Sequence, residues 1–354
     1  MKKRIIFLAI LAILLHFFVF PLPLQREHYF RADSALNLNE VDTHLTSTNA
    51  DNLVIPFKTS HFFGYLNQNF QPQLVINTTG RAASSGDFFI LFDEDTASPL
   101  TLTTASGLVI NEINASGVPF IFGRNLIFVD DNGTISSYST TGQPLWSFDT
   151  NSHVTAIALA AGITMVGLLN ENILFIDGNG QLISQYRPGG SRYGLILAAA
   201  LSPDGSHAAV ISGLYPQRFI LFRRGINDYT PIFHTELAGS ARFPLRINFR
   251  DNNFVSYEEL GFLHTYNLNR RSLSTVAHTG RLRAMTMHSF ERFQAVLSNQ
   301  DDEWQLQIFA LNSPRFILNN RFIAVNANLI TINTNRLVLV AGDTLHLITY
   351  QEAY

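Results

Sequence analysis

From residue 55 to the C-terminus, short apolar runs alternate with turns rich in Gly, Asn, Asp and Ser. Hardly any stretch shows the 3.6-residue period of an amphipathic helix, whereas apolar and β-branched runs between such turns are typical of strands. Seven runs predict buried strands: 87–92, 125–131, 163–169, 207–212, 253–259, 292–298 and 336–342. The pattern therefore predicts an all-β domain over residues 55–354.

The seven runs recur at a nearly regular interval. They begin at residues 87, 125, 163, 207, 253, 292 and 336, so neighbouring runs lie 38 to 46 residues apart. A period near 40 residues with several strands in each repeat is typical of four-stranded propeller blades. We therefore expect a seven-bladed β-propeller, in which strand A of each blade lies at the central channel and strand D at the rim.

The last predicted blade ends early. Its strands are expected at 322–332, 336–342 and 345–351, after which the chain stops without a strand D. The segment "QPQLVINT" (71–78) reads as a strand that has no blade of its own. Because an open sheet edge is stabilised by pairing, we expect this N-terminal strand to close the ring as strand D of the last blade.

Two stretches resemble the repeats of known propeller families. "ISSYSTTGQPLWSFD" (135–149) is similar to the repeat of quinoprotein-like propellers, where a turn ending in Gly precedes a strand with Trp. "LSPDGSHAAVIS" (201–212) is similar to the A–B hairpin of WD40-type propellers. The resemblance implies the fold of residues 55–354 but no activity, because propellers host many unrelated functions. The acidic and amide ligands of a pyrroloquinoline quinone are not found, so we expect no cofactor.

The first residues predict a membrane anchor. Lys2, Lys3 and Arg4 precede an apolar run over residues 5–24, which is long enough for a helix across the roughly 30 Å hydrocarbon core. The basic flank predicts an N-in, single-pass topology in a bacterial cytoplasmic membrane, with the propeller in the periplasm. A cleaved signal peptide, giving a secreted protein, is the alternative. We therefore assign residues 1–30 to a signal-anchor and the polar residues 31–54 to a linker.

Composition excludes several kinds of chemistry. The chain has no cysteine, so it has no disulfide, no thiolate metal site and no lipid-modified N-terminus. The last point separates it from the outer-membrane assembly propeller of Gram-negative bacteria, a periplasmic lipoprotein scaffold that is otherwise the nearest functional analogy. A net charge of -3 does not favour nucleic-acid binding. No metal-binding or nucleotide-binding motif is found, so we expect no metal site.

Arginine supplies nearly all the positive charge, and its predicted positions recur. Only three lysines are present, at positions 2, 3 and 58. Five of the seven expected blades carry an arginine where strand A begins, at the channel mouth: Arg81, Arg192, Arg242, Arg281 and Arg321. Arg283 follows Arg281 by two residues and so projects to the same side of its strand. The planar guanidinium group suits forked contacts with carboxylates and phosphates, so we regard these six arginines as candidate ligand-binding residues.

Acidic residues are predicted on the same face, in the loops between strands B and C. They are Asp93, Glu94, Asp95, Asp130, Asp131, Glu171, Glu258, Glu259, Asp301, Asp302, Glu303 and Asp343. Only the loop around Tyr215 has none, and this tyrosine is expected to make an aromatic contact there. Two hypotheses follow: the arginines pair with these carboxylates and hold the blades together, or several remain unpaired and bind an external anion.

The leading interpretation is a non-enzymatic binding or scaffolding protein of the cell envelope, which presents a protein- or anion-binding face. A rigid ring presents many loops at little ordering cost, which favours a protein partner. The alternative is a propeller enzyme, such as a lyase, hydrolase or quinoprotein, with its site at the channel mouth. His153 and His278, in or beside the D–A loops, would then join the arginines as catalytic candidates.

Overall fold

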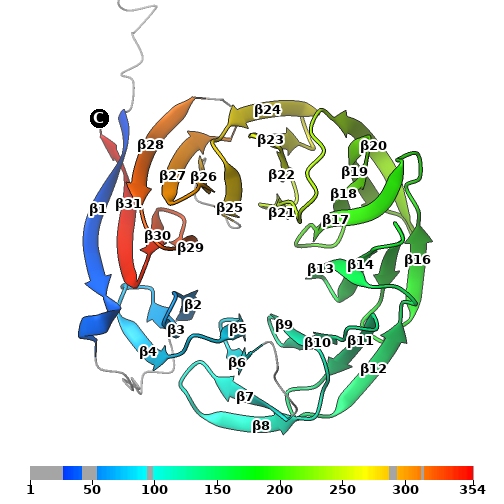
Figure 1. The fold of residues 1–354 in the computed structure, drawn as a ribbon, viewed down its shortest axis with the longest axis horizontal. Coiled ribbons are helices and arrows are strands. Elements are labelled where there is room, and N and C mark those ends of the chain that lie inside the picture. Colours follow the sequence, from blue (N-terminus) through cyan, green and yellow to red (C-terminus); the bar gives the residue numbers. More distant parts are fainter. Residues whose placement is uncertain (1–26, 42–53, 94–98, 287–292, 312–314, 354) are drawn as a thin grey trace, which may run out of the picture.

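The computed structural model describes residues 27–41, 54–93, 99–286, 293–311 and 315–353. Within these ranges the chain forms 31 strands and one short 3-10 helix, η1 (Leu38–Glu40). The strands make eight sheets arranged as blades around a central axis, so the fold is a β-propeller (Figure 1). No helix in the described residues is long and apolar enough to cross a membrane, and the anchor predicted at residues 5–24 lies outside them.

The blades are numbered here in chain order. Blade 1 contains β2 (Val54–Lys58), β3 (Phe62–Asn67) and β4 (Pro72–Asn77). Blade 2 contains β5 (Arg81–Ser84), β6 (Phe88–Phe92), β7 (Leu100–Thr104) and β8 (Val109–Ile113). Blade 3 contains β9 (Val118–Phe122), β10 (Asn125–Val129), β11 (Thr134–Tyr138) and β12 (Pro144–Asp149). Blade 4 contains β13 (Val154–Ala160), β14 (Ile163–Leu168), β15 (Ile173–Ile176) and β16 (Leu182–Tyr186).

Most strands in the second half of the ring are longer than those in the first. Blade 5 contains β17 (Tyr193–Leu201), β18 (His207–Leu214), β19 (Gln217–Arg224) and β20 (Tyr229–Leu237). Blade 6 contains β21 (Ile247–Phe249), β22 (Phe254–Glu259), β23 (Phe262–Asn267) and β24 (Ser272–Ala277). Blade 7 contains β25 (Arg281–Met285), β26 (Phe293–Gln300), β27 (Glu303–Ala310) and β28 (Phe316–Ile323). Blade 8 contains β29 (Ala327–Asn333), β30 (Arg336–Ala341), β31 (Thr344–Ala353) and β1 (Glu27–Asn37).

The all-β propeller prediction is confirmed, but the predicted count of seven blades is wrong. All seven apolar runs are second strands of blades, from β6 to β30. The eighth blade is blade 1, which the sequence pattern reduced to the single strand 71–78. That strand is β4, and it pairs with β3 inside its own sheet rather than with the last blade.

A strand from the N-terminus does close the ring, but it is β1 and not residues 71–78. β1 pairs antiparallel with β31 over the register Glu27↔Ala353 to Asn37↔Thr344 and lies at the rim of blade 8 (Figure 1). Residues 27–30, assigned above to the signal-anchor, and residues 31–37, assigned to the polar linker, therefore belong to a strand. Because residues 31–37 are mostly polar, the sequence pattern did not predict a strand here. The strand forms because the open edge of β31 supplies its hydrogen-bond partners.

Blade 1 differs from the others in strand direction. Lys58 at the end of β2 donates from Nζ to the carbonyl oxygen of Thr78, which follows the end of β4, at 3.1 Å. Both strand ends therefore lie at the face where the chain passes on to β5. In direction, β2, β3 and β4 correspond to the second, third and fourth strands of the other blades.

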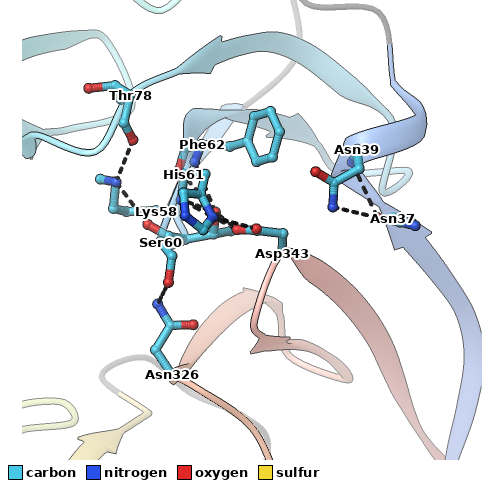
Figure 2. Close-up of polar contacts among 10 residues, drawn as sticks. Asn37, Asn39, Lys58, Ser60, His61, Phe62, Thr78, Asn326 and Asp343 are labelled. Atoms are coloured by element: carbon cyan, nitrogen blue, oxygen red, sulfur yellow. Dashed lines mark hydrogen bonds and ion pairs between the residues drawn. The ribbon is translucent and has the colours of Figure 1, made fainter.

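Polar contacts join blade 8 to blade 1, where the two ends of the ring meet (Figure 2). Asp343, in the β30–β31 turn, accepts from Thr59 Oγ1 and lies against His61 Nδ1, each at 2.7 Å. Burial alone would raise the pKa of Asp343, but the hydrogen bonds from Thr59 and His61 outweigh it and hold the pKa below the ordinary value. Asn326 Nδ2 donates to Ser60 Oγ at 2.7 Å. These contacts fasten the closing junction.

Large side chains fill the space between blades. Phe219 of β19 stacks on Tyr257 of β22 with ring centroids 3.9 Å apart, and Phe175 of β15 stacks on Tyr229 of β20 at the same distance. Stacked aromatic pairs bury a large apolar area and fix the relative position of neighbouring sheets. The core therefore runs around the ring between the sheets and leaves the connections between strands to form the two faces.

Candidate functional site

One face of the ring carries the connections that enter the innermost strands of blades 2 to 8. In the described part of blades 2 to 8, the turns between the second and third strands return to this face, because neighbouring strands are antiparallel. We call it the mouth face. Its described residues include eight exposed large apolar or aromatic side chains: Val118, Leu169, Tyr193, Tyr215, Leu260, Phe262, Ile323 and Val325.

Arginines and tyrosines meet where β17 begins. The guanidinium of Arg192 lies over the ring of Tyr193, 5.4 Å from its centroid, and Arg242 Nη2 donates to the hydroxyl of Tyr215 at 2.8 Å. The two tyrosine rings pack edge to face, with centroids 6.4 Å apart. Tyr215 has a φ of 57°, which is costly for an aromatic residue and persists only where the surroundings hold it. The Arg192 N–H, which donates to the Tyr215 carbonyl at 3.1 Å, provides part of that support.

A second group of arginines surrounds a buried carboxylate at the start of β25. Arg281 lies over the ring of Phe243, 4.4 Å from its centroid, and Arg283 Nε donates to Asn299 Oδ1 at 2.6 Å. Burial lowers the pKa of Arg283, and the positive charges of Arg281 and Arg246 lower it further. Arg281 and Arg246 are therefore near enough to Arg283 to act on its charge, and Glu258 is the negative charge that opposes them.

The connection from β20 to β21, residues 238–246, joins the two groups. Its residue Arg242 contacts Tyr215, and the next residue, Phe243, lies under Arg281. Glu259 holds the beginning of this segment by accepting from the Ala238 and Gly239 N–H groups. Glu258 holds its end by accepting from the Arg246 N–H at 2.8 Å. We call the group Arg192, Tyr193, Tyr215, Arg242, Phe243, Arg246, Arg281 and Arg283 the arginine–aromatic site.

The structure brings together four of the six predicted arginines: Arg192, Arg242, Arg281 and Arg283. Arg81 begins β5, as predicted, but on the opposite side of the ring in blade 2 (Figure 1). Arg321 is not at the mouth of the channel: it lies in β28, the rim strand of blade 7, and pairs with Glu303 at 3.1 Å. The connection to β29 follows Arg321 instead of preceding it, so the predicted register was wrong there.

The acidic loops do not neutralise these arginines. Among the described residues, no carboxylate lies within ion-pair distance of Arg192, Arg242, Arg281 or Arg283. The buried carboxylates of the site accept from backbone N–H groups, as Glu258 does from Arg246 and from Leu282, the latter at 3.3 Å. The hypothesis that the mouth arginines pair with loop carboxylates is therefore wrong for these four arginines.

The two histidine candidates have different surroundings. His278 is buried, and burial lowers its pKa, so its ring is neutral near pH 7 and turned away from solvent. His153 is exposed and lines a cavity of about 580 Å³ between β9 and β13. The described residues contain no group of three or more His, Asp or Glu side chains placed to hold a metal ion.

The sequence did not reveal the aromatic partners of the arginines. Tyr193 directly follows Arg192 and Phe243 directly follows Arg242, and this Arg–aromatic sequence could have indicated the contacts. Glu258 was assigned to an acidic loop, although it lies in β22 and is 2% exposed. Its role depends on two backbone N–H groups from different blades, which no local sequence pattern encodes.

Comparison with known proteins agrees with the architecture. A family model described as a β-propeller protein matches residues 1–350. An uncharacterized protein of Treponema pallidum (strain Nichols) is 24% identical over 317 residues, which are 87% of this chain and 84% of the relative. The crystal structure of BamB from Moraxella catarrhalis is similar with a TM-score of 0.63 at 16% identity, covering 91% of this chain and 100% of that chain. The computationally designed Ika8 protein is similar with a TM-score of 0.62 at 12% identity, covering 87% and 100%. At these identities the two structures establish a shared fold only.

Proposed function

We propose that this chain, which belongs to the β-propeller proteins, is a non-enzymatic binding and scaffolding module of the cell envelope. Its arginine–aromatic site would bind a carboxylate-bearing segment of a protein partner. The observation that carries the proposal is the gathering of four arginines on one arc of the mouth face, without a carboxylate in ion-pair distance among the described residues. Location outside the cytoplasm rests on the sequence of residues 2–24 alone.

The site is organised before any ligand arrives. The segment 238–246 is held at both ends by Glu259 and Glu258, and in its middle Gln217 Nε2 donates to the Ala241 carbonyl at 3.2 Å. Each guanidinium carries five donors and uses few of them in the contacts described. Donors that are already positioned bind an anion at a small entropic cost, which supports a recognition site rather than a solvated surface.

The surroundings of the site favour a protein over a small anion. Tyr193 and Tyr215 are 53% and 47% exposed, and Leu260 and Phe262 are exposed on the neighbouring turn of blade 6. Tyrosine and arginine are among the residues most enriched at the energetic centres of protein interfaces, where surrounding contacts exclude water. A free carboxylate would use the arginines and leave this apolar surface uncovered.

Titration with a matched pair of peptides tests the proposal. We expect acetyl-Leu-Glu-Glu-Leu-amide to bind more tightly than the peptide with Gln in place of both Glu residues, measured by calorimetry at low salt. Arg281→Gln with Arg283→Gln should raise its Kd at least about tenfold, because charge-assisted hydrogen bonds are lost. Arg224→Gln, an exposed arginine at the end of β19 on the opposite face, is the control and should change nothing. Equal affinity for both peptides would contradict the proposal.

A further inference from the structure

A second feature of the mouth face is the cavity between β9 of blade 3 and β13 of blade 4. Its volume is about 580 Å³. Most of the lining is apolar and comes from the beginnings of the two innermost strands and the end of β10, including Val118, Phe120, Val129, Val154 and Ile157. A cavity of this size is within the range that holds a small ligand or a large side chain.

The polar part of the lining is acidic. Asp130 and Asp131 lie at the rim together with His153, and no Lys or Arg is among the lining residues. Asp130 Oδ1 accepts from the N–H groups of Asn132 and Thr134 at 3.0 and 2.7 Å, which fixes the carboxylate in place. Among the described residues neither Asp130 nor Asp131 has an ion-pair partner. Two uncompensated carboxylates above an apolar pocket are complementary to a cation that has an apolar stem.

We propose that this cavity binds the side chain of a lysine or arginine from a protein partner. The methylene groups would pack on Val129, Val154 and Ile157, and the charged head would lie against Asp130 and Asp131. Long basic side chains combine these two properties, because they bury their stems while the charged end meets a polar rim. That the side chain comes from a protein rests on the proposed function, whereas the cavity and its charge do not.

The position of the cavity adds a second argument. Around the ring, β9 and β13 precede β17, β21 and β25, whose beginnings carry the arginine–aromatic site (Figure 1). The charge along this arc of the mouth face therefore changes from negative to positive. A partner segment lying along the arc would present a basic side chain at one end and acidic side chains at the other. Opposite charges at the two sites fix the direction in which such a segment binds.

The experiment measures Kd by calorimetry for three probes: acetyl-Leu-Arg-Leu-amide, the same peptide with citrulline in place of arginine, and free agmatine. We expect the arginine peptide to bind at least about tenfold more tightly than the citrulline peptide, because citrulline lacks the charge. Asp130→Asn with Asp131→Asn should remove this difference. Asp302→Asn, an exposed aspartate at the corresponding turn of blade 7, is the matched control and should preserve it.

A cavity-filling variant tests the pocket independently of charge. Val154→Phe enlarges a side chain that lines the cavity and packs toward blade 3, and we expect it to weaken binding of the arginine peptide while the melting temperature confirms that the protein is folded. Equal binding of the arginine and citrulline peptides, or no effect of Val154→Phe in a folded protein, would overturn the proposal. If agmatine binds as tightly as the arginine peptide, the claim that the bound side chain comes from a protein is wrong.

The same variants separate this proposal from the proposed function. If Asp130→Asn with Asp131→Asn abolishes binding of the arginine peptide but leaves binding of the acidic peptide unchanged, the two sites are independent, as we expect. If the acidic peptide fails to bind every variant and the wild type while the arginine peptide binds, the function proposed for the arginine–aromatic site fails and the cavity proposal stands.

Discussion

Replacing Glu258 by glutamine should change how the stability of the propeller depends on pH. Burial raises the pKa of this carboxyl from 4.5 to about 7, although hydrogen bonds from the Arg246 and Leu282 N–H groups and the charges of Arg246 and Arg281 oppose the rise. A carboxyl with a higher pKa in the folded chain binds its proton more tightly there than in the unfolded chain. Its stabilising effect is therefore fully present below about pH 4.5 and is lost as the pH rises through about 7.

The size of the effect follows from the shift. From 4.5 to about 7, at about 1.4 kcal/mol per pKa unit, the free energy of unfolding should fall by about 3 kcal/mol as the carboxyl ionises. The amide introduced by Glu258→Gln does not titrate, so the variant should escape this loss. An amide has a single carbonyl oxygen for two backbone N–H groups, which adds a loss of about 1 kcal/mol that does not depend on pH.

The measurement is urea denaturation, followed by intrinsic fluorescence, at a series of pH values between about 5 and 8. The relevant quantity is the unfolding free energy of Glu258→Gln minus that of the wild type, which should rise with pH. Histidine titrations are common to both proteins and cancel in the difference. Glu112→Gln, at an exposed position of β8, is the control and should follow the wild type. Parallel curves for wild type and Glu258→Gln would refute the reasoning, because the carboxyl would then ionise alike in both states.

Three further predictions follow from the described contacts. Phe243→Leu should weaken binding of the acidic peptide about twofold to fivefold in calorimetry, because Arg281 loses an aromatic platform worth about 0.5–1 kcal/mol; unchanged affinity would show that the stacking does not position this arginine. The pKa of Asp343 is held low, so its stabilising effect is present at neutral pH and lost as the pH falls below about 4, and Asp343→Asn should lower the melting temperature at pH 7 more than at pH 3. Removing residues 1–37 deletes β1 and exposes the edge of β31, so light scattering should show concentration-dependent aggregation. A monomeric and equally stable product would show that β1 is not needed to close the ring.

Much of the ring could be predicted because each second strand is buried on both sides and reads as a continuous apolar run. Blade 1 was not predicted from the sequence, because none of its strands reads as such a continuous apolar run. β3 contains Gly64, and glycine inside a strand ordinarily weakens the prediction. The structure explains this glycine: a Cβ at Gly64 would lie 2.1 Å from the Leu74 carbonyl oxygen and 2.7 Å from the ring of Phe57. The close packing around β3 therefore requires glycine at position 64, and this glycine interrupts the apolar run from which the strand would have been predicted.

The site was predicted in part for a related reason. Arg81 and Arg281 begin their strands as expected, whereas Arg321 was placed one element too late. Between β28 and β29 the sequence "FIAVNANLI" (322–330) has no glycine or proline to mark the end of one strand and the start of the next. The mainly apolar pattern, interrupted only by Asn326 and Asn328, does not mark the bend, so a rim arginine was predicted at the channel. The correct position depends on its pairing with Glu303 across β27 and β28.

The arginines of the arginine–aromatic site are not neutralised, because the buried carboxylates near the site have other partners. Glu258 and Glu259 accept from backbone N–H groups at the two ends of segment 238–246, so the segment is fixed by the acids and presents Arg242 to solvent. A backbone N–H has no net charge, so satisfying a carboxylate in this way leaves the positive charge of the arginines available. As Glu258 takes up a proton near pH 7, the site should become more positive and bind the acidic peptide more tightly at pH 6 than at pH 8. The same titration that stabilises the fold at low pH would then strengthen binding, and Glu258→Gln should abolish both dependences together.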